Sequence, residues 1–122
     1  MAAERDRHYL FIGTPSPKGW QWLLENPEAA DREEVARAAV ENVGGELLGY
    51  YWGVNNARNY IIVRLPADAE TVPAFLIMRL STGLLTKYEA IEIMPSDRLP
   101  VVLERIAEIS AADDIQSGET EE

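Results

Sequence analysis

The sequence predicts an α+β fold in which four strands form one antiparallel sheet and helices cover one face of it. Two observations lead to this prediction. Four segments alternate in apolar residues with a period of two, whereas the segments between them carry apolar stripes with helical spacing. Their order along the chain is strand, helix, strand, strand, helix, strand, with further short helices. A length of 122 residues suits a single domain.

The first strand is predicted over residues 7–13, where apolar side chains occur at both alternating positions. Such a pattern is typical of a central strand that is covered on both faces. A short helix over residues 17–25 follows, with Ser16 as its N-cap and Pro17 at its first position. The stripe of this helix that we expect to pack on the core is Trp20, Leu23 and Leu24.

The next helix is predicted to begin at Asp31, because Asp31 and Glu34 have the spacing of a capping box. It ends at Gly44-Gly45, where a left-handed cap is expected. Its apolar stripe is narrow and consists of small residues: Val35, Ala38, Ala39, Val40 and Val43.

Residues 46–65, ELLGYYWGVNNARNYIIVRL, are predicted to form a β-hairpin. Their connection, residues 53–58, is rich in Gly and Asn, which tolerate the backbone conformations of turns. Pro66 ends the second strand of this hairpin.

Asp68 or Thr71 is expected to cap a third helix, which carries Pro73 near its first turn and ends at Gly83. A long fourth strand is predicted over residues 84–94. Ser96 or Asp97 then caps a last helix with an apolar stripe formed by Leu99, Val102, Leu103, Ile106 and Ile109.

This order of elements predicts a ferredoxin-like βαββαβ sandwich with a four-stranded antiparallel sheet, helices on one face and an extra C-terminal helix. We expect residues 1–6 to be a flexible N-terminus and residues 7–110 to form the domain. Residues 111–122 are polar and acidic, which predicts a disordered tail.

Strand alternation divides the sheet residues between two faces. The set expected to face the helices is Tyr9, Phe11, Leu47, Tyr51, Ile61, Val63, Leu65, Ile91 and Ile93. The opposite set is His8, Leu10, Ile12, Leu48, Tyr50, Trp52, Tyr60, Ile62, Arg64, Tyr88, Ala90 and Glu92. A sheet face in contact with water should be mostly polar, yet this second set is apolar and aromatic. It therefore predicts a homodimer, or a larger oligomer, that buries the second face, with room for a ligand cavity between the sheets.

Candidate chemistry is limited to that face. His8, the only histidine, would act as a general acid or base, or else simply be hydrogen-bonded at a strand end. Arg64 would hold an anionic substrate, or else pair with Glu92. Four aromatic residues would stack a ligand, or else pack in the interface: Tyr50, Trp52, Tyr60 and Tyr88. Ile62 is expected on the dimer face, where a charge should give a monomer or an unfolded protein.

The composition excludes several classes of function. A net charge of −10 argues against binding to nucleic acids or anionic membranes. The chain has no cysteine, and one histidine cannot build a multi-histidine metal site, so we expect no metal and no cofactor. No apolar run is long enough to span a membrane, and the N-terminus has no signal-peptide core. A cytoplasmic protein is the expectation.

Short motifs over residues 8–95 resemble the GYD domain family, small bacterial and archaeal proteins of unassigned biochemical role. The motifs are Thr14, Gly19, Pro27, Arg32, Gly44-Gly45, Tyr51-Trp52, Pro66 and Asp68. The resemblance implies a ferredoxin-like fold of the dimeric α/β-barrel type. The family's Gly-x-Tyr-Asp signature is replaced by Asn55-Asn56-Ala57-Arg58, and Arg64 stands where an acidic residue is common. Any role that the family's signature tyrosine and aspartate have therefore cannot be transferred to this chain.

No strong catalytic motif is present. The first functional prediction is a small homo-oligomeric module, non-enzymatic, for assembly or for binding a small ligand. The alternative is a metal-free, cofactor-independent enzyme of the dimeric α+β barrel type, similar to a monooxygenase or isomerase. Its substrate would be small and anionic or aromatic, with His8 and Arg64 as the catalytic residues.

Overall fold

The computed structural model describes residues 6–30 and 32–112. Most of the predicted flexible N-terminus, Asp31 and residues 113–122 of the predicted tail therefore lie outside the described residues. Asp6, which we assigned to the flexible N-terminus, instead begins the first strand. The last helix continues to Ala112, two residues into the predicted tail.

The fold is α+β and ferredoxin-like, as predicted. Its strands are β1 (Asp6–Pro15), β2 (Glu46–Trp52), β3 (Asn59–Pro66) and β4 (Leu85–Ile93). They form one antiparallel sheet in the order β2-β3-β1-β4, which places β1 and β3 in the middle. The helices are α2 (Pro17–Glu25), α3 (Glu33–Asn42), α4 (Thr71–Leu80) and α5 (Leu99–Ala112), with short 3-10 helices η1 (Pro27–Ala30) and η2 (Ser96–Arg98).

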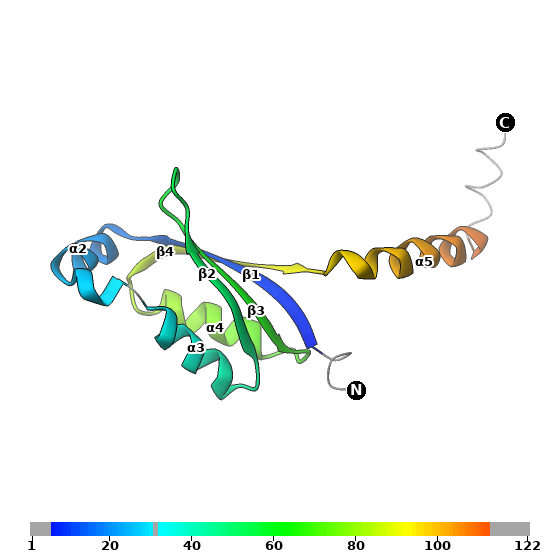
Figure 1. Ribbon diagram of the computed structural model, residues 1–122, viewed down its shortest axis with the longest axis horizontal. Coiled ribbons are helices and arrows are strands. Elements are labelled where there is room, and N and C mark those ends of the chain that lie inside the picture. The colour runs from blue at the N-terminus through cyan, green and yellow to red at the C-terminus, as the bar shows by residue number, and fades with distance from the viewer. Residues whose placement is uncertain (1–5, 31, 113–122) are drawn as a thin grey trace.

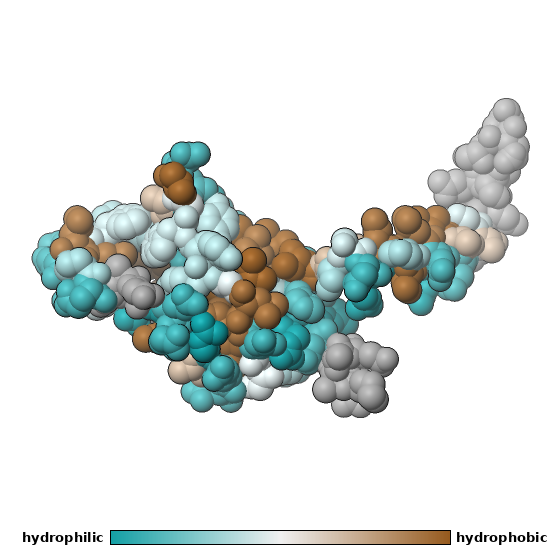
Figure 2. Space-filling model, viewed as in Figure 1, coloured by the Kyte–Doolittle hydropathy of each residue, from teal (hydrophilic) through white to brown (hydrophobic). Residues whose placement is uncertain are grey.

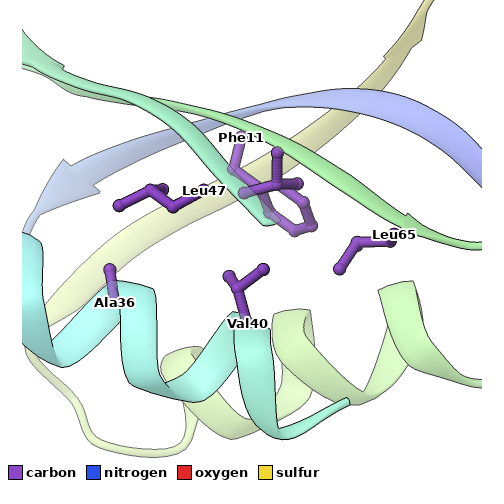
Figure 3. Packing of buried hydrophobic residues seen from close by; sticks show 6 residues of the cluster. Phe11, Ala36, Val40, Leu47 and Leu65 are labelled. Carbon is purple, nitrogen blue, oxygen red and sulfur yellow. The ribbon is translucent and has the colours of Figure 1, made fainter. Parts of the chain in front are cut away.

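The helices α3 and α4 cover one face of the sheet, which we call the inner face (Figure 1). None of the helices within residues 6–30 and 32–112 lies over the other, outer face. Between the inner face and the helices lies a small core, whose buried members are Phe11, Ala36, Val40, Leu47, Val63 and Leu65 (Figure 3). Leu65 is completely buried. Phe11 also contacts the rings of Phe75 and Tyr88, at centroid distances of 6.1 and 5.4 Å.

Two of the predicted helical stripes are corrected by this packing. In α2 Gly19, Trp22 and Leu23 are turned toward the rest of the protein, and the predicted Trp20 contacts Trp52 at a centroid distance of 5.8 Å. The predicted Leu24, in contrast, is 80% exposed. In α3 the buried residues are Ala36 and Val40, and the predicted Val35, Ala38 and Val43 are exposed. The side of α2 that faces the protein is set by Gly19, because its backbone approaches the Leu84 carbonyl so closely that only glycine fits there. A Cβ added to Gly19 would lie 2.1 Å from the Leu84 carbonyl oxygen.

The predicted cap of α2 and the left-handed end of α3 are confirmed. The N-cap of α4 is Glu70 rather than Asp68 or Thr71, and the predicted caps Ser96 and Asp97 lie within η2, whose N-cap is Pro95. Ser16 caps α2: its Oγ accepts a hydrogen bond from the Gly19 N–H at 3.0 Å and donates one to the Gly83 carbonyl at 2.7 Å. Gly44, at φ +84°, provides the left-handed cap after α3. Asp68 accepts hydrogen bonds from the N–H groups of Glu70 and Thr71 at the start of α4, and these bonds lower the pKa of its carboxyl. The N-cap of α3 is Arg32, without a side-chain cap.

The helix α5 extends from the end of β4 away from the sheet (Figure 1). Every residue from Ile91 to Ala111 is exposed, which includes the whole predicted apolar stripe of α5. Figure 2 shows hydrophobic side chains gathered along this helix. No helix within residues 6–30 and 32–112 is long and apolar enough to cross a membrane.

Candidate functional site

The strand register corrects the predicted outer face. Residues that face each other across antiparallel strands point to the same side of the sheet. Phe11, which is in the core, pairs with Ala90, so Ala90 and its alternating neighbours Tyr88 and Glu92 belong to the inner face. Ile91 and Ile93 pair with Leu10 and His8 and belong to the outer face. The prediction for β4 was therefore inverted.

A β-bulge corrects the prediction for β2. Leu47 pairs with Val63 and Gly49 pairs with Ile62, so Leu48 is one extra residue in β2. An extra residue shifts the alternation of everything that follows it. Tyr50 and Trp52 consequently lie on the inner face, and Tyr51, predicted to be inside, lies on the outer face and is 61% exposed.

The outer face defined in this way is apolar along its middle. Leu10, Ile12 and Ile62 lie on its two central strands and are partly buried, and Ile91, on β4, is 47% exposed. Its other members by register are Asp6, His8, Thr14, Glu46, Gly49, Tyr51, Tyr60, Arg64, Pro66, Lys87, Glu89 and Ile93. Of the predicted dimer-face residues, Tyr60 and Ile62 are on this face, whereas Tyr50, Trp52, Tyr88 and Glu92 are not.

The two predicted catalytic residues are neighbours, since His8 pairs with Arg64 across β1 and β3. The Arg64 guanidinium, however, already forms ion pairs with Asp6 and with Glu46, whose Oε1 is 2.9 Å from Arg64 Nη2. Hydrogen bonds to Glu46 and then to Asp6 raise the pKa of Arg64. Glu92, the predicted partner of Arg64, pairs instead with Arg7 on the other side of the sheet, at 3.2 Å. This arrangement favours a structural role for Arg64.

The aromatic residues displaced from the outer face line a cavity of about 340 Å³ on the inner side, between the sheet, α2, the start of α3 and the connection from α4 to β4. We call it the aromatic cavity. Its rings are Trp22, Tyr50, Trp52 and Tyr88, and two arginines, Arg32 and Arg79, also line it. No Asp or Glu is found among the described residues of its lining.

The environment of this cavity is apolar enough to affect ionisation. Burial raises the pKa of the Tyr88 hydroxyl to about 12, although the charge of Arg79 and a hydrogen bond with it act to lower that pKa. The nearby Tyr50 acts to raise it. The guanidinium of Arg32 lies over the Trp22 ring, 5.7 Å from its centroid, in a cation–π geometry.

The sequence reasoning missed both cavity arginines as candidate residues. A signal for Arg79 was available, because it is the only charged residue in α4, TVPAFLIMRL. A lone charge in an apolar helix needs a specific environment. Arg32 gave no such signal, since it lies in the polar segment that opens α3.

Within residues 6–30 and 32–112, no three His, Cys, Asp or Glu side chains are grouped closely enough to hold a metal ion. Comparisons of the chain with protein-family models, with curated proteins and with solved structures found no match. Function must therefore be argued from the two features described above, the outer face with α5 and the aromatic cavity.

Proposed function

We propose that this chain is a self-associating assembly module in which two copies bury the outer face and α5 against each other. The observation that carries the proposal is that the described part of one chain presents two large apolar surfaces and covers neither. Ile91 and Ile93 lie on the bare sheet face, and the stripe residue Ile109 is 61% exposed on α5. Monomeric proteins rarely expose contiguous apolar surface of this extent.

The size of the two surfaces is sufficient for a stable interface. With nine residues in β4 and four strands, the outer face measures about 30 by 19 Å, or roughly 550 Å². The 14 residues of α5 form a rod of about 21 Å, whose apolar side offers roughly 200 Å². The total approaches the roughly 800 Å² that each partner contributes to a standard interface.

Within residues 6–30 and 32–112, no segment provides the cover. Only Met94 and Pro95 separate β4 from η2, where the Arg98 N–H donates to the Pro95 carbonyl at 2.9 Å. The chain therefore runs directly from β4 into α5, and α5 points away from its own sheet (Figure 1). In a two-fold dimer, α5 of one copy would lie against the sheet of the other, and the reciprocal contact would follow by symmetry.

The distribution of charge is compatible with this contact despite a net charge of −10. Charged side chains of the outer face lie toward its ends. Arg64 with Glu46 and Asp6 forms one end, and Lys87 with Glu89 forms the other, at 3.1 Å. The middle is aliphatic. An apolar centre with a polar rim is the usual anatomy of a protein interface.

The test is a molar mass by light scattering at micromolar concentration. We expect twice 13.6 kDa for the wild type and a monomer for Ile62→Asp, which puts a charge at the centre of the outer face. Val54→Asp is the matched control, because it adds the same charge at a turn residue that is 96% exposed and should remain dimeric. A stable wild-type monomer would refute the proposal.

The reciprocal placement of α5 has its own test. The chain has no cysteine, so Glu104→Cys gives a single site for a spin label on the polar side of α5. Spin-labelled protein at natural isotope abundance is mixed with ¹⁵N-labelled wild type. The amide signals of Leu10 and Ile91 in the wild type are then monitored. Broadening of these signals is expected only if α5 of one copy contacts the sheet of another. A second sample, in which the spin-labelled chain itself carries ¹⁵N, is the comparison. Broadening in that sample but not in the mixture would show that α5 folds back on its own sheet.

The enzyme hypothesis is not favoured, because Arg64 is engaged by two carboxylates and neither it nor His8 lines the aromatic cavity. The resemblance to the GYD domain family agrees with the proposed dimer and stays a prediction, as does a cytoplasmic location.

A further inference from the structure

The aromatic cavity has the dimensions of a ligand site rather than of a packing defect. Its volume of about 340 Å³ lies within the range of roughly 300–1,000 Å³ that is usual for small-molecule sites. The neighbouring void in the core, lined in part by Phe11 and Val63, measures only about 20 Å³. A space of the larger size accepts a molecule of one or two rings.

The cavity walls favour a flat, apolar molecule. Trp22 projects from α2, Tyr50 and Trp52 from the end of β2, and Tyr88 from β4, so rings reach the cavity from three elements. Trp52 lines the cavity, contacts the ring of Trp20 at a centroid distance of 5.8 Å and is still 37% exposed. Aromatic rings stack on one another in offset or edge-to-face geometry, and each such pair contributes about 0.5–1.5 kcal/mol.

The polar groups of the cavity favour an anion. Acidic residues outnumber basic ones 21 to 11 in this chain, yet the described lining contains Arg32 and Arg79 and no carboxylate. No ion pair joins either arginine to a carboxylate of residues 6–30 or 32–112. The Arg32 guanidinium lies over the Trp22 ring, and the edge of a guanidinium can make a bidentate contact with a carboxylate.

The backbone holds these groups in place. The close approach of Gly19 to Leu84 is accompanied by a hydrogen bond from the Ser16 N–H to the Leu84 carbonyl at 2.9 Å. These contacts fix α2, which carries Trp22, against the connection that follows Arg79. Sites that are held by rigid elements lose less entropy when a ligand binds.

We propose that the aromatic cavity binds a small aromatic carboxylate. Its ring lies against Trp22, Trp52 and Tyr88, and its carboxylate contacts Arg32 and Arg79. This site is on the inner side of the sheet and does not depend on self-association, which uses the outer face. The proposal therefore assigns the molecule a second, separate binding property.

The test compares 2-naphthoate with its neutral isostere 2-naphthamide by calorimetry. For the wild type we expect the acid to bind at submillimolar concentration and at least tenfold more tightly than the amide, since a charged hydrogen bond is usually worth that factor or more. Arg32→Gln and Arg79→Gln should each weaken binding of the acid by about tenfold and leave the amide unchanged. Arg58→Gln is the control, because it removes the same charge from an exposed turn residue.

Several outcomes would overturn the proposal. These are absence of naphthoate binding up to millimolar concentration, equal binding of acid and amide by the wild type, and an equal loss in the Arg58→Gln control. If the pocket variants fail to fold, the acid-to-amide ratio of the wild type still decides the point. The indole N–H signals in an NMR spectrum locate the ligand, and those of Trp22 and Trp52 should shift when naphthoate is added. If neither signal shifts, the ligand binds outside the aromatic cavity and the proposal is wrong.

Discussion

Replacement of Gly19 by alanine is the most direct test of how α2 is held against the body of the protein. An alanine Cβ would lie 2.1 Å from the Leu84 carbonyl oxygen, which is a backbone atom and cannot rotate away. An ordinary contact needs about 3.4 Å, so the two segments must separate by roughly 1 Å. We therefore expect Gly19→Ala to destabilise the fold.

Two opposing effects determine the magnitude. Alanine is favoured over glycine within a helix by up to about 1 kcal/mol. Overpacking costs about 1–3 kcal/mol, and separation of the segments also strains the hydrogen bonds that Ser16 makes to Gly83 and Leu84, each worth about 1 kcal/mol. The steric effect is larger, so the free energy of unfolding should fall by about 1–3 kcal/mol. This corresponds to a decrease in Tm of roughly 4–12 °C.

Urea and thermal unfolding followed by circular dichroism would measure this change. Lys18→Ala, at an exposed position of the same helix, should stay within about 0.5 kcal/mol of wild type. Gly83→Ala separates strain from steric clash: its φ is +77° but the nearest atom to a new Cβ is 3.8 Å away, so a loss of about 1 kcal/mol is expected. A Gly19→Ala variant as stable as wild type would show that the close approach to Leu84 is wrong.

Further predictions concern a helix cap, a buried tyrosine and an ion pair. Ser16→Ala should lower the free energy of unfolding by about 1 kcal/mol in urea titrations, because the cap of α2 is lost, and no change would contradict the assigned cap. The pKa of the Tyr88 hydroxyl is about 12 in the folded protein, against an ordinary value of 10.0 that applies to the unfolded chain. Between pH 10 and pH 12, unfolding therefore releases a proton from this hydroxyl. Stability should accordingly fall by about 2 kcal/mol as the pH rises from 10 to 12. In Tyr88→Phe this part of the pH dependence should be absent, and an unchanged slope would assign it to another group. A double-mutant cycle of Arg64→Gln and Glu46→Gln should give a coupling of about 1 kcal/mol that decreases with added salt, since both side chains are partly exposed.

The sequence determined which elements form and in what order, because those signals are local. The Ser16 cap, the left-handed glycine after α3 and the Gly- and Asn-rich connection of the hairpin act within a few residues of themselves. The alternation of residues 46–65 and 84–94 likewise identified the strands, which the structure places at Glu46–Trp52, Asn59–Pro66 and Leu85–Ile93. The ferredoxin-like topology follows from that order.

Only the tertiary structure decided which side of β2 and β4 is inside, whereas alternation had already placed the core residues Phe11, Val63 and Leu65 correctly. Alternation identifies the inner set when the other set is polar, but in β4 Ile91 and Ile93 alternate with Tyr88 and Ala90, and both sets are apolar. The choice depends on the pairing with Phe11, which is a contact between distant parts of the chain.

The bulge at Leu48 and the approach of Gly19 to Leu84 are of the same kind, since each arises from how two segments fit together. Together they turn Tyr50, Trp52 and Trp22 toward one cavity, beside Arg32 and Arg79. The residues of the candidate site come from segments far apart in the sequence, so no local pattern could have grouped them.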